Sequence, residues 1–442
     1  MSRGTVSFGT VGCRLNQYET DQIKRAFVEK GYRIVPFDAP ADVCVINTCT
    51  VTGRSDYRSR QLARRARRRN AGATVVVTGC YAQNQPEACG SIPAVDVVVG
   101  NARKLDLPDL LTRRNGCPRI VMDPLPRVFA EGPEVRGHPG GRTRAFLKIQ
   151  DGCDQVCAYC AVRVARGRAR SRPWVFIERE AQRAIETGYR EIVLTGINLG
   201  SYGRDLPGGV SLAAVIERLA SMPDIGRIRL SSVEPQEITD ELVDIVTSHP
   251  KVCRHFHIPF QSGSDGVLRR MNRTYDAGQF EALVSRIAKL APGSGLGADV
   301  MVGFPAESEA DFRKTEELIR RLPMTYLHVF SYSPRVGTAA ANFGGAVPGE
   351  SKKARSLALR SLGQEKSLAF RTRSVGSSLR VLFETADQTG QLSGLSGNYI
   401  RVAVPGPEHL LNSFADVEVT DVTATAVKGK LVASEKKEAM AS

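Results

Sequence analysis

The chain of 442 residues lacks any apolar run that approaches the roughly 18–20 residues of a membrane-spanning helix. Its beginning also lacks a basic stretch followed by an apolar core, and residues 5–10 have instead the composition of a first β-strand. No amphipathic anchor and no lipidation signal are present. We therefore expect no signal peptide and no membrane association, and we expect the protein to be cytoplasmic.

Cysteine is scarce, and the ten cysteines in 442 residues are too few for the disulfide framework of a small secreted protein. A zinc-finger signature is missing as well. The C-x₂-C pair at Cys157 and Cys160 has no second C-x₂-C pair downstream. In a cytosolic chain, clustered cysteines more often bind a metal or take part in chemistry.

Acidic residues are in the minority, because 46 Asp and Glu face 61 Lys and Arg, for a formal net charge of +15. Such a charge favours a polyanionic partner, and nucleic acid is a better candidate than an anionic membrane because the chain has no anchor. A general preference for arginine over lysine would also raise the charge, so the charge alone is weak support.

The most informative stretch is Asp151-Gly-Cys-Asp-Gln-Val-Cys-Ala-Tyr-Cys160, which follows the apolar run 145–149. Cys153, Cys157 and Cys160 have the spacing C-x₃-C-x₂-C, so three thiolates on one loop can reach a single metal centre. An iron–sulfur cube is usually held by four cysteines, and three leave one iron open. An open coordination position distinguishes a catalytic metal from a closed structural one. Zinc is the main alternative at this point.

Three further cysteines, Cys13, Cys49 and Cys80, each lie one to three residues beyond a predicted strand and are separated by about one βα repeat each. In a parallel sheet the carboxyl ends of all strands lie on one edge, where ligand crevices form. We therefore predict a second three-cysteine site, with three separate buried thiols as the alternative. The cysteines without this strand-end position are Cys44, Cys89, Cys117 and Cys253.

Alternating strand and helix patterns predict an α/β protein with three folded parts. The first is a parallel sheet, with strands at 5–10, 43–48, 74–78 and 95–99 and helices at 16–30 and 54–70. The second is an open, partial (β/α)₆ barrel, with strands at 145–150, 191–195, 228–231, 255–258, 298–302 and 326–330. The third is a small all-β barrel, of a kind that often binds oligonucleotides. Its predicted strands are 379–383, 399–403, 415–419 and 423–427.

These patterns divide the chain into five segments. We expect an N-terminal α/β domain over residues 1–120, a linker over 121–141, the partial barrel over 142–372, the β-barrel over 373–433 and a disordered tail over 434–442.

Two arginine-rich segments are candidates for contact with nucleic acid. The predicted helix 54–70 carries eight arginines, although a solvated helix face explains them equally well. They are Arg54, Arg58, Arg60, Arg64, Arg65, Arg67, Arg68 and Arg69. The second segment forms a predicted rim beside the cysteine loop, where phosphate contact is physically reasonable. Its members are Arg163, Arg166, Arg168, Arg170 and Arg172.

The cysteine motifs resemble those of the radical S-adenosylmethionine (SAM) methylthiotransferases over nearly the whole chain. The stretches Gly12-Cys-Arg-Leu-Asn-Gln-Tyr-Glu-Thr20, Asn47-Thr-Cys-Thr-Val-Thr52 and Val77-Thr-Gly-Cys-Tyr-Ala-Gln83 are similar to the subgroup that acts on N6-threonylcarbamoyladenosine in tRNA. The isopentenyladenosine subgroup typically has Gln-Met-Asn after its first cysteine, and the ribosomal-protein subgroup a lysine-asparagine version. Two departures concern SAM contacts: Val162-Arg-Val-Ala165 replaces an Ile/Val-Pro-Tyr-like run, and Thr195-Gly-Ile-Asn198 replaces Gly-Gly-Glu.

The resemblance implies two [4Fe-4S] clusters, SAM as a second cofactor, a C-terminal TRAM domain and a tRNA substrate. By position, Cys13, Cys49 and Cys80 match the ligands of an auxiliary cluster, and Cys153, Cys157 and Cys160 those of the SAM cluster. The resemblance also implies an electron donor of the flavodoxin or ferredoxin type and a sulfur donor. The candidate SAM contacts, each of which could equally be an ordinary turn residue, are Tyr159, Thr195, Gly196, Ser231, Gln261 and Gly303.

The implied reaction is methylthiolation of adenine C2 beside the anticodon, with one SAM as radical source and one as methyl donor. Removal of an aromatic hydrogen calls for a radical because this C–H has no useful acidity. Within the same enzyme class, isopentenyladenosine tRNA or a ribosomal protein side chain are alternative substrates. An RNA-binding protein with structural metal clusters is the alternative from another class.

Overall fold

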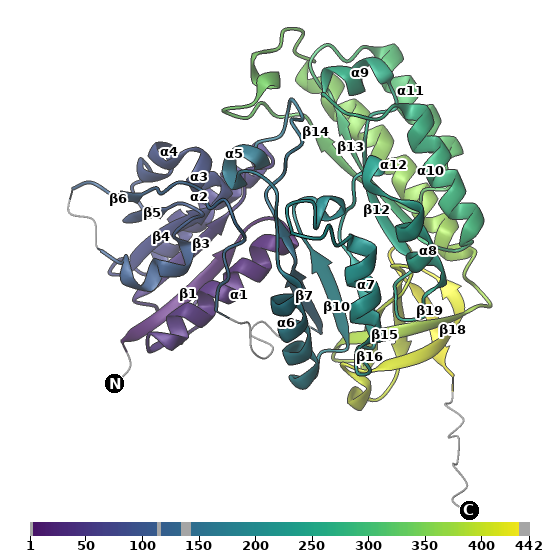
Figure 1. Ribbon diagram of the computed structural model, residues 1–442, viewed down its shortest axis with the longest axis horizontal. Helices are drawn as coiled ribbons and strands as arrows, with labels where there is room; N and C mark the ends of the chain where they lie inside the picture. The colour runs from purple at the N-terminus through teal and green to yellow at the C-terminus, as the bar shows by residue number, and fades with distance from the viewer. Residues whose placement is uncertain (1–2, 113–115, 134–142, 433–442) are drawn as a thin grey trace, which may run out of the picture.

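The computed structural model describes residues 3–112, 116–133 and 143–432, and it contains a parallel-sheet α/β domain, a partial barrel and a small β-barrel (Figure 1). The predicted tail at 434–442 lies outside the described residues. In the described ranges, no helix has both the length and the apolar character that a membrane span requires.

The N-terminal sheet has six parallel strands in the order β2-β1-β3-β4-β5-β6. Its elements are β1 (Gly4–Thr10), α1 (Arg14–Glu29), β2 (Tyr32–Ile34), β3 (Val43–Thr48), α2 (Gly53–Arg69), β4 (Thr74–Gly79), α3 (Cys80–Asn84), α4 (Pro86–Gly90), β5 (Val97–Val99), the 3₁₀ helix η1 (Lys104–Asp109) and β6 (Arg119–Val121). Every residue of β3 and β4 is buried because the sheet is covered on both faces.

The central domain consists of two three-stranded parallel sheets, β11-β10-β7 and β12-β13-β14, which an isolated bridge between Ile228 and Val252 connects. Its strands are β7 (Arg144–Lys148), β10 (Glu191–Thr195), β11 (Arg227–Leu230), β12 (His255–Gln261), β13 (Gly295–Val302) and β14 (Tyr326–Ser331). The short strands β8 (Gln150–Asp151) and β9 (Arg170–Ser171) form a separate pair.

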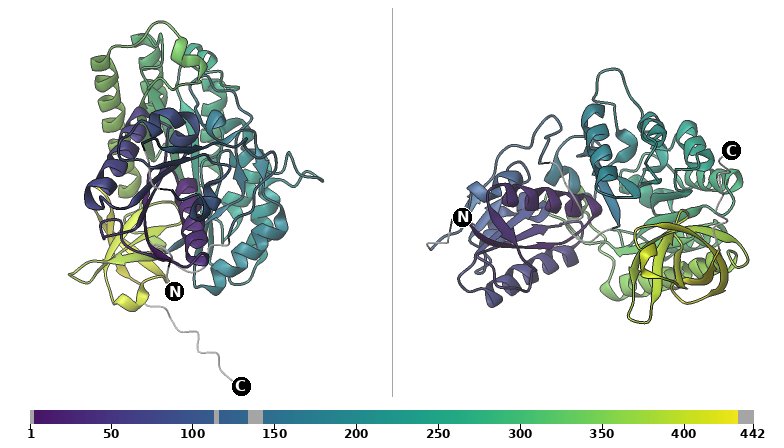
Figure 2. Two further views of the ribbon diagram at one scale, coloured as in Figure 1. Left: turned by 90° about the vertical axis from the view of Figure 1, so that its left-hand side faces the viewer. Right: turned by 90° about the horizontal axis from the view of Figure 1, so that it is seen from below.

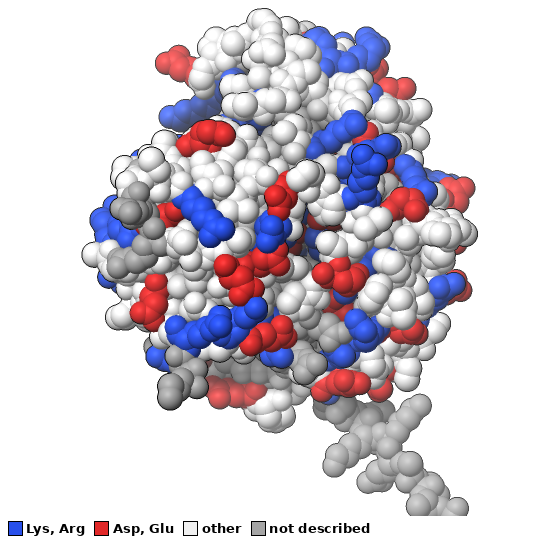
Figure 3. Space-filling model, turned by 60° about the vertical axis from the view of Figure 1, so that its left-hand side comes forward, with Lys and Arg blue, Asp and Glu red and all other residues white. Residues whose placement is uncertain are grey.

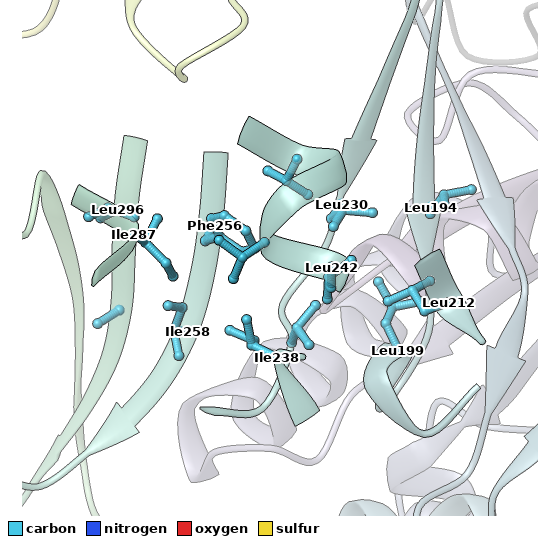
Figure 4. Close-up of a cluster of buried hydrophobic side chains, with 14 of the residues drawn as sticks. Leu194, Leu199, Leu212, Leu230, Ile238, Leu242, Phe256, Ile258, Ile287 and Leu296 are labelled. Atoms are coloured by element: carbon cyan, nitrogen blue, oxygen red, sulfur yellow. The ribbon is translucent and has the colours of Figure 1, made fainter. Parts of the chain in front are cut away.

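Helices on the outside of these strands complete the domain. They are α6 (Trp174–Glu186), α7 (Leu212–Ser221), α8 (Asp240–Ser248), α9 (Asp265–Arg270), α10 (Ala277–Leu290), α11 (Glu309–Arg321) and α12 (Gly349–Thr372). The short helix α5 (Val162–Arg166) instead lies against α3 of the N-terminal domain (Figure 1). The 3₁₀ helices are η2 (Leu199–Ser201), η3 (Pro235–Glu237) and η4 (Ala339–Asn342). The largest hydrophobic cluster joins strands and helices, as in the contact region of Phe256, Ile287 and Leu296 (Figure 4).

The C-terminal domain is a closed barrel with the strand order β15-β16-β17-β19-β18. Its elements are β15 (Ser378–Ala386), β16 (Gln391–Ser396), β17 (Arg401–Pro405), η5 (Glu408–Leu410), β18 (Phe414–Val422) and β19 (Val427–Leu431). The sequence did not predict β16, because Gln391-Leu-Ser-Gly-Leu-Ser396 contains no β-branched or aromatic residue. The predicted strand 423–427 is wrong for residues 423–426, because β19 begins only at Val427. Thr423 closes a turn there, with its amide donating to Ala426 O at 2.8 Å.

The C-terminal barrel closes the amino-terminal ends of the central strands (Figure 2). Arg229 of β11 donates to Ser396 O at 2.8 Å and to Gly397 O at 3.1 Å, and Asn398 donates to Gly293 O at 3.0 Å. Tyr399 has a φ of 71°, and its ring stacks on His255 with centroids 4.5 Å apart. The turn between β16 and β17 is therefore inserted into the end of the central barrel.

Candidate metal centres

Three cysteines lie together at the carboxyl-terminal edge of the N-terminal sheet. Cys13 precedes α1, while Cys49 and Cys80 directly follow β3 and β4. Because β1, β3 and β4 are neighbours, the three turns are adjacent. Gly12 has a φ of +110°, and a Cβ there would lie only 2.6 Å from Cys49 Cβ. This close approach of two turns requires glycine.

The thiols at this edge are largely buried. Cys49 and Cys80 are 4% and 6% exposed, whereas Cys13 is exposed. Burial raises the pKa of Cys49 to about 12, and negative charge on Cys80 and Cys13 raises it further. Burial also raises the pKa of Cys80, although Arg166 opposes this effect. Such thiols ionise readily only when a nearby cation compensates the charge, as a bound metal does.

The second group of cysteines lies on the loop between β8 and α5, and the chain around it is tightly held. Gly152 has a φ of +69°, and a Cβ there would lie 1.9 Å from Arg168 O. The Cys153 amide donates to Gly167 O at 3.1 Å. The loop therefore begins in a fixed position against the segment that follows α5.

The loop thiols lie near one another. Burial raises the pKa of Cys153 to about 12, and negative charge on Cys160 and Cys157 raises it further. Burial raises the pKa of Cys160 to about 11, again with a contribution from Cys157. These thiols, like those at the sheet edge, favour a bound metal over free thiolates.

The spacing of the sulfur atoms bears on which metal group fits. Thiolates about 2.3 Å from one tetrahedral zinc ion lie about 3.8 Å from one another. In the described ranges, which contain all ten cysteines, no three cysteine sulfur atoms lie within 4.8 Å of each other. An iron–sulfur cube takes one cysteine on each of its separate irons and therefore holds them farther apart. Both three-cysteine groups fit such a cluster better than a single zinc ion.

A buried arginine joins the two cysteine groups. Arg166 donates to Glu19 at 2.8 Å and 2.9 Å, to Asp151 at 3.1 Å and to Cys80 Sγ at 3.3 Å. Glu19 comes from α1 of the N-terminal domain and Asp151 from the start of the cysteine loop. One guanidinium thus ties the sheet edge, the loop and a cysteine together.

Two lysines increase the positive charge at this junction. Lys148 lies 2.8 Å from Glu19 and 2.7 Å from Asp151, and Lys104 lies 2.6 Å from Glu19. Although burial opposes it, these lysines and Arg166 hold the pKa of Glu19 well below its usual range. Arg170 lies 3.5 Å from Asp151 as well, so four cations face two carboxylates. An anionic thiolate-bound cluster beside Cys80 would balance this charge.

Arg273 lies beside the loop cysteines, as Arg166 lies beside Cys80 at the sheet edge. Its side chain is 2% exposed and forms an ion pair with Glu234. The same guanidinium lies 3.3 Å from Cys157 Sγ and 3.5 Å from Tyr159 Oη. Arg273 thus places a buried positive charge beside Cys157, as Arg166 does beside Cys80.

The sequence did not identify these arginines as partners of cysteines. The predicted rim is wrong for Arg166, Arg170 and Arg172, which are only 2%, 3% and 2% exposed. Arg168 does remain on the surface. The only signal for Arg166 was its closeness to the loop in sequence. Nothing in the sequence pointed to Arg273, which reaches Cys157 through the tertiary fold.

Three of the predicted SAM contacts lie at the ends of neighbouring strands. Thr195 ends β10 and Ser231 follows β11, and their hydroxyl oxygens are 3.4 Å apart. Gly196 follows Thr195, and a Cβ there would lie 3.0 Å from Gln150 Cβ. These three residues share the edge from which the cysteine loop starts.

The other three predicted contacts lie on the second sheet and the loop. Gln261 ends β12 with a φ of 64°, and Gly303 follows β13 with a φ of +73°. The Gly303 amide donates to Glu307 at 2.6 Å, which gives this glycine a structural role as well. Tyr159 packs edge-on against Phe304 with ring centroids 6.4 Å apart. The binding of SAM by all six residues stays a prediction.

Replacing Arg166 with glutamine should destabilise the junction between the domains. Loss of one member of a buried ion-paired group typically lowers the free energy of unfolding by about 3–5 kcal/mol. We expect a lower unfolding temperature and a lower iron content in anaerobically purified protein. Arg168→Gln is the matched control, because the Arg168 side chain is 83% exposed. Equal unfolding temperatures and iron contents for the two variants would contradict a joining role for Arg166.

Comparison with protein-family models gives three matches along the chain. Residues 147–319 match the Radical SAM superfamily, residues 5–100 match the Uncharacterized protein family UPF0004, and residues 372–432 match the TRAM domain. The radical SAM protein TsrM from Kitasatospora setae has a similar fold, with a TM-score of 0.58 at 17% identity over 77% of each chain. The fold and the cysteine loop thus define a radical SAM protein.

Comparison with curated proteins gives relatives over nearly the whole chain. The threonylcarbamoyladenosine tRNA methylthiotransferase MtaB of Thermotoga maritima is 37% identical over 90% of both chains. The MtaB protein of Bacillus subtilis is 37% identical over 94% of this chain and 93% of its own. A tRNA-2-methylthio-N(6)-dimethylallyladenosine synthase of Moorella thermoacetica is 34% identical over 98% of this chain and 99% of its own. The chain belongs to the radical SAM tRNA methylthiotransferase family.

Proposed function

We propose that the protein methylthiolates C2 of N6-threonylcarbamoyladenosine next to the anticodon of tRNA. The observation that carries the proposal is the pair of three-cysteine groups joined by Arg166, which contacts Cys80 directly and reaches the loop through Asp151. A reaction that needs both a radical source and a sulfur source requires two such centres close together. The similarity to proteins named for this substrate supports the choice of nucleoside.

Cys153, Cys157 and Cys160 would hold one [4Fe-4S] cluster, and Cys13, Cys49 and Cys80 the other. When bound, the first supplies the electron that cleaves one SAM to a 5′-deoxyadenosyl radical, and the second supplies the sulfur that a second SAM methylates. The chain's own residues hold the reactants in position and exclude water. Electrons would come from a flavodoxin- or ferredoxin-like donor, and the sulfur would be replaced by a separate donor.

Exposed basic residues support RNA as the substrate. On α2, Arg54, Arg58, Arg64 and Arg68 are exposed, and no described residue forms an ion pair or hydrogen bond with their side chains. Figure 3 shows basic and acidic side chains interspersed on the face that it displays, so the net charge is not gathered into one patch there. Local groups such as these arginines are therefore better candidates for phosphate contact than the overall charge.

The C-terminal barrel offers a second group of exposed cations. Lys428 and Lys430 alternate with buried residues on β19 and are exposed, as is Arg401 on β17. Side chains on the outer face of such a barrel can contact phosphates without disturbing its core. Because tRNA is the substrate, we propose that the protein acts in the cytoplasm.

The proposal is tested with the cluster-reconstituted protein, SAM, a reductant, sulfide and synthetic anticodon stem-loop RNA. RNA that carries N6-threonylcarbamoyladenosine should yield its 2-methylthio form, detected by nucleoside mass spectrometry. RNA of the same sequence with N6-dimethylallyladenosine serves as the comparison. Methylthiolation of the dimethylallyl RNA alone would assign the protein to the other substrate. If neither RNA reacts although SAM is cleaved, the function as a tRNA-modifying enzyme would be wrong.

A further inference from the structure

Four polar residues form a layer on the inner face of the second barrel sheet: His257 on β12, Asp299 on β13, and Tyr326 and His328 on β14. We call them the inner polar layer. Asp299 pairs with His328 in the strand register, so the two side chains share a face. The residues between them, such as Ala298 and Val329, belong to the hydrophobic cluster that includes the outer helices. The polar face is therefore the face directed into the barrel.

The inner polar layer is connected by hydrogen bonds. His257 Nε2 lies 2.9 Å and His328 Nδ1 lies 3.3 Å from the same Asp299 oxygen, Oδ1. His257 Nδ1 lies 2.9 Å from Tyr326 Oη, and His255 Nε2 lies 2.8 Å from it. If His257 donates from Nε2 to Asp299, Tyr326 must donate to His257 Nδ1 and accept from His255. Every ring in the layer is thereby held in one orientation.

Two atoms of the layer, Asp299 Oδ2 and His328 Nε2, are available to accept further hydrogen bonds. Both contacts of Asp299 reach Oδ1, and no described residue donates to Oδ2. His328 uses Nδ1 for Asp299, which leaves Nε2 as an acceptor in the neutral ring. The Asp299 and His328 side chains are 25% and 53% exposed, so a ligand can reach both atoms.

Side-chain contacts lead from the layer toward both cysteine groups. Met301, which follows Asp299 by two residues on the same face of β13, packs in one cluster with Tyr159 of the cysteine loop. From the other side, Arg14, the neighbour of Cys13, donates to Tyr399 Oη at 3.1 Å, and the Tyr399 ring stacks on Tyr326 at 5.4 Å. These contacts make the layer a candidate surface for a nucleotide that reacts between the two centres.

We propose that the inner polar layer binds the threonylcarbamoyl group of the substrate nucleotide, an inference that rests on the proposed function. That group carries a carboxylate, a hydroxyl and urea N–H donors. Arg14 would donate to the carboxylate, Asp299 Oδ2 would accept from a urea N–H, and His328 Nε2 would accept from the hydroxyl. The cationic donor Arg14 thus matches the anionic carboxylate, and the acceptor Asp299 matches the urea N–H donor.

The layer disfavours an apolar substituent at the same position. A dimethylallyl group would remove water from Asp299 and His328 without replacing its hydrogen bonds, which is costly for buried polar groups. Such sites therefore discriminate strongly against analogues that lack the polar group.

A divalent cation is the other ligand that two imidazoles and a carboxylate can take, since their ligand atoms lie within 4.8 Å of one another. The positive charge of Arg14 and Arg229 close to Tyr326 opposes a cation.

The test compares binding of two stem-loop RNAs that differ only in the threonylcarbamoyl group. Dissociation constants are measured by fluorescence polarisation with cluster-loaded protein and SAM, without reductant. The parent should prefer the modified RNA, and Asp299→Asn should reduce this preference by about tenfold or more. Binding of the unmodified RNA should not change. With reductant, the variant should have a raised KM for the modified RNA and unchanged 5′-deoxyadenosine formation from SAM alone.

Two further variants complete the experiment. His328→Gln should also reduce the preference, and its half-exposed position makes misfolding a poor explanation. Asp244→Asn, on the exposed face of α8, is the matched control and should behave as the parent. An unchanged preference in Asp299→Asn, or a divalent metal bound in addition to iron and lost with Asp299, would overturn the inference. A parent that does not methylthiolate the modified RNA at all would instead overturn the proposed function.

Discussion

Replacing Cys49 with alanine is expected to abolish methylthiolation and to leave radical formation intact. Cys49 lies in the edge formed by β1, β3 and β4, away from the loop that would hold the SAM cluster. The variant should therefore still form 5′-deoxyadenosine from SAM under reducing conditions. Methylthiolated nucleoside should fall below detection, and iron content should decrease by about half, the share of one of two similar clusters.

Cys44→Ala is the matched control for this variant. Cys44 is buried inside β3, where its sulfur accepts from Ser7 Oγ at 3.3 Å, and it points away from the sheet edge into the cluster with Ile46. Its replacement should cost about 1 kcal/mol of stability and no iron. Loss of iron and methylthiolation in Cys44→Ala, or full methylthiolation in Cys49→Ala, would show that the strand-end cysteines are not the ligands.

Replacing Cys157 with alanine is expected to abolish SAM cleavage altogether. Cys157 is the middle cysteine of the loop, and its sulfur contacts the buried Arg273. A cluster with only two remaining loop thiolates should not persist, so both 5′-deoxyadenosine and methylthiolated product should disappear. The cysteines at the sheet edge should keep their share of the iron because they belong to another domain.

Cys117→Ala provides the comparison for Cys157→Ala, since Cys117 is exposed and lies outside both groups. This variant should retain the iron content and both activities of the parent. Production of 5′-deoxyadenosine by Cys157→Ala at the parent rate would mean that the radical forms elsewhere.

The strand-end position of the N-terminal cysteines could be read from the sequence because it depends on local patterns. The apolar run of β3 ends at Cys49 and that of β4 at Cys80, and strand direction alone brings such positions to one edge. The strands 43–48 and 191–195 agree with β3 and β10 to the residue. Short buried runs bounded by turn residues are the clearest signal for strands of a parallel sheet.

The contacts between domains could not be read in this way. Arg166 and Glu19 are 147 residues apart, and a dense run of arginines normally indicates an exposed surface. Arg166 lies inside the protein because the buried carboxylates of Glu19 and Asp151 compensate its charge. The inner polar layer was missed for a similar reason. His257, Asp299 and His328 come from three strands, and only the strand register brings them together.

The Tyr399 turn limits how the C-terminal barrel can be exchanged between proteins. If the C-terminal barrel served only to bind RNA, it could be fused to another protein through its linker without further changes. Here the turn also fits against Gly295, where a Cβ would lie 2.4 Å from Asn398 O. A chimera that carries a foreign barrel without this tyrosine would leave His255 and Tyr326 facing solvent. We therefore expect the central domain and the C-terminal barrel to be inherited together. The loops of the two domains that meet at the Tyr399 turn should change in length together.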